Sequence, residues 1–161
     1  MARRDFDDSG DAFANISGKV AAGGMADDVM VVQGLLQLHW EFSKEAQRLV
    51  PTKPPVDGAA HKSNGILISQ FQKDIMKRPK PQGFVNPATH FDLKSLSTST
   101  IFALNARANL ILAAIGSPHK DSVEFLVANF PKLAGPLGSP RAPRAPGEPR
   151  EPRDPHLLST D

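Results

Sequence analysis

The chain has 161 residues, of which 40% are hydrophobic and 22% charged, a composition typical of a soluble globular protein with one domain and some flexible sequence. The net charge of +2 is too small to indicate nucleic-acid binding by itself, and the lack of Cys excludes disulfide frameworks and thiolate metal sites. The start reads MARRDFDDSGDAFANIS, with acidic residues where a Sec signal peptide has an apolar stretch. We therefore expect a chain made in soluble form, without membrane insertion, that would need a non-Sec route to leave the cytoplasm.

The first predicted helix follows residues 1–15, which are acidic and polar and are expected to be mostly disordered. Asp27 or Asp28 can cap this helix, and it must end before Pro51. Gly34 predicts a close contact with a neighbouring helix, because glycine inside a helix is otherwise unfavourable by about 1 kcal/mol relative to Ala. The apolar residues that share one face at three-to-four spacing are Val29, Val32, Leu35, Leu36 and Trp40.

Two further helices are predicted before residue 97. One runs from Asn64 to Lys77, and the other starts at Thr89 and continues to Leu96. The buried stripe expected for the first of these comprises Ile68, Phe71 and Ile75.

Residues 97–134 are predicted to form a helical extension. After the sequence STST, a helical pattern resumes from Ile101 to Ile115, and DSVEFLVANF predicts a last short helix that Pro131 closes. The residues that share a face of the longer helix are Leu104, Ala108, Ile111 and Ile115.

The last segment, residues 135–161, is expected to be a disordered tail rich in Pro and Arg. From Ser139 onward, proline recurs at every third residue over six triplets. Polyproline II has three residues per turn, so the prolines would line one edge of such a helix. The pattern is typical either of a ligand for a groove-type proline-binding domain or of a semi-rigid solvated tail, and the composition favours the tail.

Two stretches of the chain repeat the same arrangement of a turn, a loop and a helix start. Gly58 and Gly83 each follow a residue suited to a turn, and six residues later come the candidate N-caps Asn64 and Thr89. Two valines are expected to hold these loops against a common core: Val56 and Val85. The repeat therefore predicts two loop-helix units that pack with the first helix as a small three-helix core.

Three blocks in this order carry a resemblance to a known family: DDVMVVQGLLQLH, VDGAAHKSNGILISQFQ and PQGFVNPATHFDLKSL. They resemble the peptidoglycan-binding-like domain of bacterial cell-wall proteins, in a proteobacterial subgroup with a glycine-rich entry, over residues 16–96. The matching residues of the last two blocks include Val56, Asp57, Gly58, Ile68, Phe71, Gln72, Pro81, Gly83, Val85, Pro87 and Thr89, and Gln33 with Leu36 matches the first. The chain departs from the family pattern at His61, which replaces Gly, at Asn64, which replaces Thr, and at Gln82, which often is Asp.

The resemblance implies a mostly α fold with a small three-helix domain at residues 16–96 and a non-catalytic function in binding peptidoglycan or another cell-wall polymer. The motif residues, Val56, Asp57, Gly58, Asn64, Phe71, Gln72, Gly83, Val85, Pro87 and Thr89, are expected to be structural. An alternative is a protein-interaction adaptor that keeps the fold without sugar binding and recruits a protein partner through its tail or helical extension. The implied site of action is the cell wall or the periplasm, reached by phage-style lysis or by a dedicated secretion machine.

A sugar-binding surface needs aromatic faces and amide or hydroxyl groups in a shallow groove. The candidate ligand-binding residues on the loop side are His61, Gln82, Phe84 and Asn86, followed by Gln70 and Trp40. We expect no catalytic residues, metal or cofactor, because the zinc-hydrolase, nucleophile-elbow and phosphate-loop motifs do not occur.

One cluster of cations leaves two interpretations open. The sequence QKDIMKRPK places Lys73, Lys77, Arg78 and Lys80 close together. They could meet anionic wall polymers or stem-peptide carboxylates. They could also form a solvated helix end, where cations are favourable, and this second interpretation is favoured.

Overall fold

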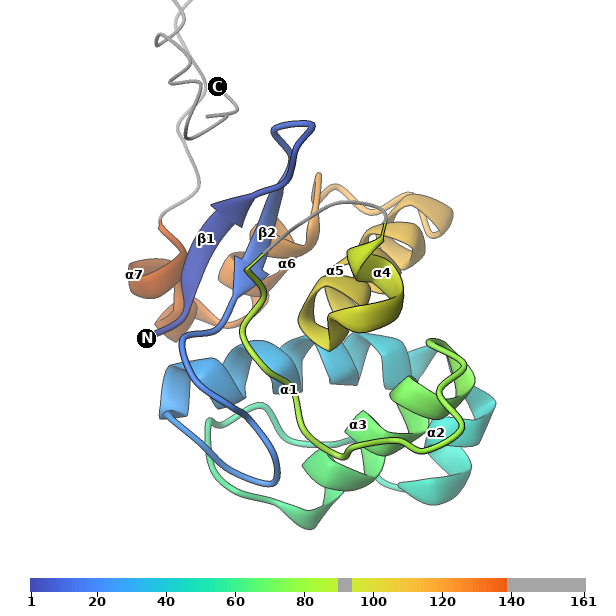
Figure 1. Cartoon of the computed structure of the whole chain (residues 1–161). Coiled ribbons are helices and arrows are strands. Elements are labelled where there is room, and N and C mark those ends of the chain that lie inside the picture. The colour runs from blue at the N-terminus through green and yellow to red at the C-terminus, as the bar shows by residue number, and fades with distance from the viewer. Residues whose placement is uncertain (90–93, 139–161) are drawn as a thin grey trace, which may run out of the picture.

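The structure is a computed structural model that describes residues 1–89 and 94–138 (Figure 1). In this part of the chain the fold is mostly helical, as predicted, with one small sheet of two strands. No helix in it is long and apolar enough to span a bilayer. The elements in order are β1 (Arg3–Phe6), β2 (Ala12–Asn15), α1 (Ala26–Glu41), α2 (Lys44–Leu49), α3 (Lys62–Asp74), α4 (Ser95–Thr98), α5 (Thr100–Ala114), α6 (Ser122–Asn129), the 3-10 helix η1 (Pro131–Leu133) and α7 (Ala134–Leu137).

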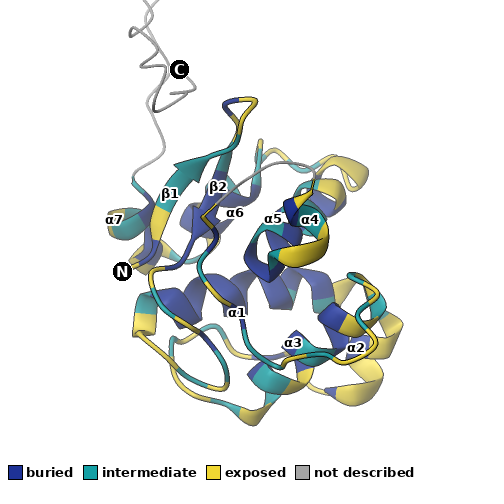
Figure 2. Cartoon of the chain, viewed as in Figure 1, coloured by how far each residue is buried: buried dark blue, intermediate teal, exposed yellow. Residues whose placement is uncertain are grey.

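Helix α1 is the central helix of the molecule, and Figure 2 shows it buried along most of its length. The predicted apolar face is confirmed, with Trp40 partly buried at its end, but Val31 and Leu38 on other faces are buried as well. The helix is enclosed because α2, α3, α5 and α6 all pack against it. The predicted close contact at Gly34 is also confirmed, since a Cβ atom there would lie 2.5 Å from Leu126 Cδ2 on α6.

The prediction that Asp27 or Asp28 caps α1 was wrong, because the N-cap position is Met25 and no side chain caps it. Both carboxylates reach back to the preceding chain instead. Asp28 accepts hydrogen bonds from the backbone N–H groups of Ser17 at 3.1 Å and Gly18 at 3.0 Å. These loop amides need acceptors, and the first turn of α1 supplies them.

Residues 1–15, predicted to be disordered, form an ordered hairpin in which β1 pairs antiparallel with β2. The turn between the strands is closed by Asp7, whose carboxylate accepts from the backbone N–H groups of Ser9 and Asp11, both at 2.9 Å. The side chain of Asn105 on α5 binds both the N–H and the C=O of Ala14, at 2.8 and 2.9 Å. The hairpin is ordered because β2 is buried against α5 and α6, which the polar composition of the segment does not reveal.

Helix α3 differs from the prediction at both ends. It begins at Lys62 with His61 at the N-cap position, so Asn64 is a buried residue of the first turn and not the cap. It ends at Asp74, and Ile75, which was expected in the buried stripe, is 37% exposed.

The helix expected to start at Thr89 falls partly on residues 90–93, which lie outside the described residues. The described helix that follows is α4, one turn long, and it leads through Ser99 into α5.

Helices α5 and α6 agree with the predicted extension, although Ile115 lies beyond the end of α5 and is 52% exposed. Residues 135–137, assigned to the disordered tail, belong to α7, and Leu137 is buried. The rest of the proposed tail, residues 139–161, lies outside the described residues. One hydrophobic core joins the hairpin, α1, α3 and the helices from α5 to α7, so the extension shares its core with residues 16–96.

Candidate functional site: a cleft beside the second glycine loop

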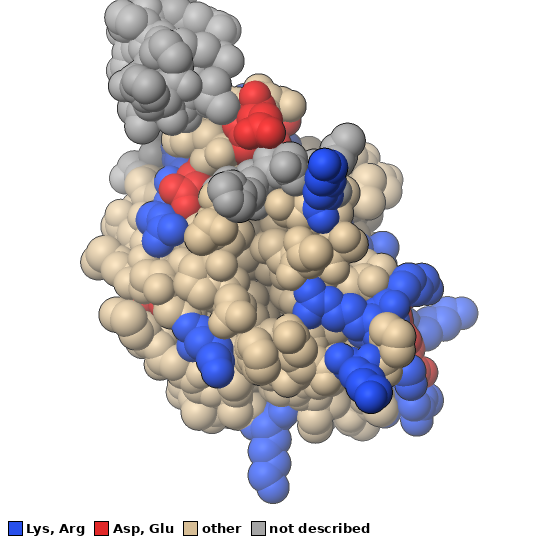
Figure 3. Space-filling model, in the orientation of Figure 1, with Lys and Arg blue, Asp and Glu red and all other residues tan. Residues whose placement is uncertain are grey.

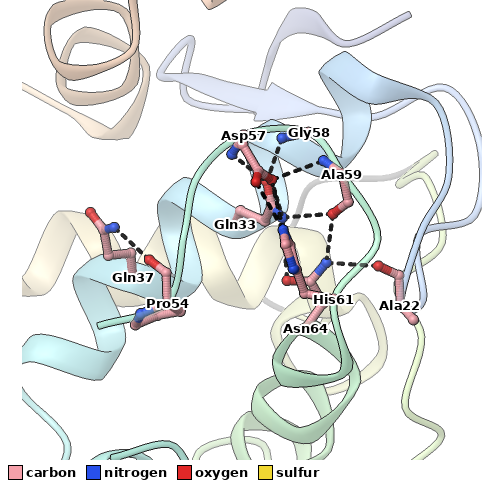
Figure 4. A network of polar contacts seen from close by, with 9 residues as sticks. All are labelled: Ala22, Gln33, Gln37, Pro54, Asp57, Gly58, Ala59, His61 and Asn64. Carbon is pink, nitrogen blue, oxygen red and sulfur yellow. Dashed lines mark hydrogen bonds and ion pairs between the residues drawn. The ribbon is translucent and has the colours of Figure 1, made fainter. Parts of the chain in front are cut away.

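The first glycine loop is held by the buried side chain of Gln33, which projects from α1 into the loop between α2 and α3 (Figure 4). Its Oε1 accepts from the backbone N–H groups of Asp57 at 3.0 Å and Gly58 at 2.8 Å. Its Nε2 donates to the carbonyl of Ala59 at 3.0 Å. Gly58 has a φ of +77°, a conformation that favours glycine.

The second glycine loop is held in the same way by Gln72 on α3. Its Oε1 accepts from the backbone N–H groups of Gln82 at 2.8 Å and Gly83 at 3.0 Å, and its Nε2 donates to the carbonyl of Phe84 at 2.8 Å. Gly83 has a φ of +75°, close to that of Gly58. The repeat seen in the sequence is therefore a repeat of one hydrogen-bonding arrangement, in which a buried glutamine satisfies three backbone groups of a glycine turn.

The first loop is closed by its own side chains. His61 Nε2 lies 2.9 Å from a carboxylate oxygen of Asp57. The pKa of Asp57 is lowered, first by the hydrogen bond from the backbone N–H of Ala59 and then by the His61 side chain. Asn64 donates to the carbonyl of Ala22 at 2.7 Å, which ties the helix start to the loop before α1 (Figure 4). The polar groups of this loop are paired with one another, with Gln33 of α1 and with the chain before α1.

The second loop is anchored to two other parts of the fold beyond Gln72. Val85 and Val20 exchange backbone hydrogen bonds of 2.7 and 2.9 Å, and both side chains are fully buried. Asn15 on β2 binds both the C=O and the N–H of Ala88, at 2.9 and 3.0 Å. The segment from Gly83 to Ala88 is thus a fixed wall, held by α3, by the chain before α1 and by the hairpin.

This wall faces α4 and the start of α5 across a cavity of about 220 Å³. Phe84 contributes an aromatic ring to the cavity, and the Lys19 ammonium lies 4.6 Å from the centre of that ring. The amide of Asn86 and the hydroxyl of Thr98 make no hydrogen bond to another described residue. The described residues that line the cavity are Gln82, Phe84, Asn86, Pro87, Ala88, Thr89, Ser95, Thr98, Ser99 and Thr100.

A second cavity of about 670 Å³ continues the first, because Gln82, Asn86 and Thr98 line both. Its other described lining residues are Arg78, Pro79, Lys80 and Ser97. Figure 3 shows Lys and Arg side chains gathered on this side of the molecule, over the end of α3 and over α2. Together the two cavities form a cleft with hydroxyls and amides at one end and cations at the other.

The structure brings together three of the six candidate ligand-binding residues, namely Gln82, Phe84 and Asn86. His61 lies at the first loop with Asp57, as described above. Trp40 is partly buried, and its indole N–H donates to the carbonyl of Val50 at 2.7 Å.

Gln70, the remaining candidate, is buried in a polar network that joins α1, α3 and α5. His39 Nε2 lies 2.9 Å from Gln70 Oε1, and Gln70 Nε2 donates to Asp74 at 2.9 Å. On the other side of the ring, Arg107 Nε lies 3.4 Å from His39 Nδ1. Burial lowers the pKa of His39, so the neutral ring donates to Gln70 and accepts from Arg107. The network holds three helices together within the core.

Sequence reasoning missed the hydroxyl-bearing wall of the cleft, which Ser95, Thr98, Ser99 and Thr100 supply. The hydroxyl residues are visible in the sequence as STST, but in the helical periodicity this stretch is only an interruption between helices. It also missed that Gln33 and Gln72 hold the glycine turns: Gln33 appeared only as a match to the family pattern, and Gln72 only as one of the motif residues expected to be structural.

The cleft offers amides, hydroxyls, an aromatic ring and cations, which suit a polar ligand with anionic groups. Among the described residues no cluster of three or more His, Asp or Glu side chains is arranged to hold a metal ion. Comparisons with family models, curated proteins and solved structures find no match to the chain. A proposal about function therefore rests on the chemistry of the cleft and on the sequence resemblance of residues 16–96.

Proposed function

We propose that the protein is a non-catalytic module that binds bacterial cell-wall peptidoglycan in the cleft beside the second glycine loop. The observation that carries this proposal is the cleft itself, where Gln82, Phe84 and Asn86 meet the hydroxyls of α4 and α5. The resemblance of residues 16–96 to peptidoglycan-binding-like domains supports the same function. The site of action is then the cell wall.

The chemistry of the cleft fits a wall glycan with its attached peptide. Hydroxyl and acetamido groups of a glycan pair with side-chain amides and hydroxyls, and Asn86 and Thr98 have such groups free of other described residues. An apolar edge of a sugar ring packs against an aromatic ring, which Phe84 supplies. The carboxylates of a wall peptide are complementary to the cations at the other end of the cleft.

Co-sedimentation of the purified full chain with intact sacculi tests the proposal. We expect the parent protein to sediment with sacculi and the variants Asn86→Ala and Phe84→Ala to sediment less. Lys44→Ala is the control, because Lys44 is an exposed residue of α2 outside the cleft. Circular dichroism spectra that match the parent show that each variant is folded. A parent protein that stays in the supernatant would refute the proposal.

The second candidate function is a protein-interaction adaptor that recruits a partner through the helical extension. The observation that favours it is the exposure of two apolar side chains, Leu110 at 67% on α5 and Ile115 at 52% just after it. This function predicts that the parent protein does not sediment with sacculi. It also predicts saturable binding to one purified partner protein, weakened by Leu110→Ser.

A further inference from the structure

Arg78 occupies a fixed position at the cationic end of the cleft. Its Nη1 donates to Gln82 Oε1 at 2.9 Å, and its Nη2 donates to the carbonyl of Thr98 at 2.7 Å. A further contact of Nη2, to the carbonyl of Ser97, measures 3.5 Å. All three acceptors are neutral, and within the described residues Arg78 takes part in no ion pair. The guanidinium is therefore oriented by the protein, and no carboxylate of the described residues compensates its charge.

The backbone that presents Arg78 is unusual. Lys77 has a φ of +60° and is the one non-glycine residue with a positive φ in the part of the chain that the structure describes. The next amide, that of Arg78, donates to the carbonyl of Gln72 at 2.9 Å and closes the turn after α3. Pro79 and Pro81 restrict the chain that follows. Such strained backbone persists where the surrounding structure enforces it, and it is concentrated at ligand-binding sites.

The charged residues known to line the larger cavity, within 1–89 and 94–138, are both cations. Arg78 and Lys80 line it, and none of its other described lining residues is acidic. The nearest carboxylate along the chain, that of Asp74, accepts a hydrogen bond from Gln70 in the buried network. A cavity of about 670 Å³ with two cations on its wall attracts an anionic group.

We propose that Arg78 and Lys80 form an anion subsite that binds a carboxylate or phosphate group of the ligand. Arg78 has five N–H donors, and its contacts leave the Nε–H and one Nη1–H, which lie on different sides of the guanidinium, so that each can donate one hydrogen bond to an anion. Lys80 adds a point charge on the same cavity. The identification of the anion as part of a wall polymer rests on the proposed function, but the subsite itself does not.

The first test compares Arg78→Gln and Lys80→Gln with the control Lys73→Gln in sedimentation with sacculi. Lys73 lies in the last turn of α3 and is exposed, but it does not line the cleft. Hydrogen bonds between charged groups are strong enough that we expect each cleft variant to bind about tenfold more weakly, with the control unchanged. Equal losses of binding in all three variants would show a general attraction between charges. Unchanged binding in both cleft variants would show that the cavity does not bind the ligand. Both outcomes overturn the subsite.

A second test does not depend on wall binding. The full chain is titrated with inorganic phosphate and with N-acetylglycine, and the Arg78 Nε–H resonance is followed by NMR. We expect a saturable shift that Lys80→Gln weakens and Lys73→Gln leaves unchanged. A saturable shift in a protein that does not sediment with sacculi would support the subsite and refute the proposed function. Sedimentation that is insensitive to Arg78 and Lys80, without a saturable shift, would refute the subsite and keep the proposed function.

Two treatments of the sacculi distinguish the sources of the anion. Amidation of peptide carboxylates removes one source, and hydrofluoric acid, which strips phosphate-containing polymers, removes the other. The treatment that makes the parent protein bind as weakly as Lys80→Gln identifies the group that the subsite binds.

Discussion

Replacement of Gln72 by Ala tests whether the glutamine clamp holds the second glycine loop. Gln72 is fully buried, and its amide makes four hydrogen bonds of 2.8 to 3.0 Å, three to the loop and one to Thr100 at the start of α5. Alanine removes all four and leaves two N–H donors and two oxygen acceptors without their partner. The loop and α5 then lose the connection that the Gln72 side chain makes between them.

The size of the effect follows from these contacts. Each hydrogen bond contributes a net free energy of about 1 kcal/mol to stability, so the loss of four would lower the free energy of unfolding by about 4 kcal/mol. Water reaches part of the loop, because Gln82 is exposed, and it replaces some of the lost partners. We therefore expect the free energy of unfolding to fall by about 3 kcal/mol, a large part of the roughly 5–15 kcal/mol typical of a domain.

Urea unfolding, followed by the fluorescence of the single Trp, measures this loss. Gln47→Ala is the matched control, because the Gln47 amide also donates two hydrogen bonds to carbonyls, of Trp40 and Glu41, but at the exposed surface. We expect it to change the free energy of unfolding by less than about 1 kcal/mol. A Gln72→Ala variant as stable as Gln47→Ala would refute the clamp.

Gln72→Glu separates the hydrogen bonds from the packing. The introduced carboxyl keeps the shape and still accepts from the two loop amides, but only its protonated form can donate to the carbonyl of Phe84. Burial at this position favours the neutral form, so we expect the pKa of the introduced carboxyl to be raised in the folded state above the unfolded value of about 4.3. The variant should match the parent most closely below that value and become relatively less stable as the pH rises through the folded pKa. A stability difference that does not change with pH would contradict the donor role of Gln72.

Two further predictions concern the turn glycines and the buried histidine. Gly58→Ala should lower the free energy of unfolding by about 2–4 kcal/mol, and Gly83→Ala by about 1–2 kcal/mol. Both glycines have positive φ, but only a Cβ at Gly58 would meet a backbone atom, the Ala26 carbonyl oxygen at 2.7 Å. Equal losses in urea unfolding would contradict this prediction. Burial lowers the pKa of His39 in the folded state below its ordinary value of 6.5. As the pH falls below 6.5, the unfolded chain therefore binds a proton at His39 before the folded chain does. The folded state loses stability over the range from 6.5 down to the folded pKa. Urea unfolding at pH 7.5 and 5.5 should show a larger loss for the parent than for His39→Gln, and an equal loss in both would rule out His39 as its source.

The helices could be predicted from the sequence because their apolar residues recur at helical spacing. This signal located α1, α3, α5 and α6, but it does not specify how many sides of a helix are covered. Helix α1 was expected to bury one face, and it is enclosed because four helices pack around it. The short α2 gives too little periodicity to detect, although Ser43 caps it by accepting from the N–H of Ala46.

The errors at polar positions have a common physical origin. Asp28, Asn64 and Gln33 were assigned local roles or none, because a sequence shows only which local groups a polar side chain can reach. In the fold their partners are distant along the chain, for instance the carbonyl of Ala22 for Asn64. A turn signal in the N-terminal segment, DDSG, was present, but the burial that makes its hairpin stable comes from α5 and α6.

The candidate site was located in part because Phe84 stands out as an aromatic residue in a polar turn, with Gln82 and Asn86 beside it. The other wall of the cleft comes from residues 95–100, and no local pattern predicts that they face the loop.

The two glycine loops share one hydrogen-bonding arrangement, but the candidate site lies only at the second loop. Each glutamine satisfies the same three backbone groups, so both turns have the same shape. The turn at Gly58 uses its own side chains, Asp57 and His61, to close itself. Gln72, in contrast, binds Thr100 as well as its loop, so a single side chain fixes the two walls of the cleft relative to each other. A ligand in the cleft would meet preformed walls, and less ordering free energy would then be lost on binding. The stability of the fold and the shape of the cleft therefore depend on the same buried amide, and a Gln72 variant that stays folded should bind its ligand more weakly even though Gln72 does not line the cleft.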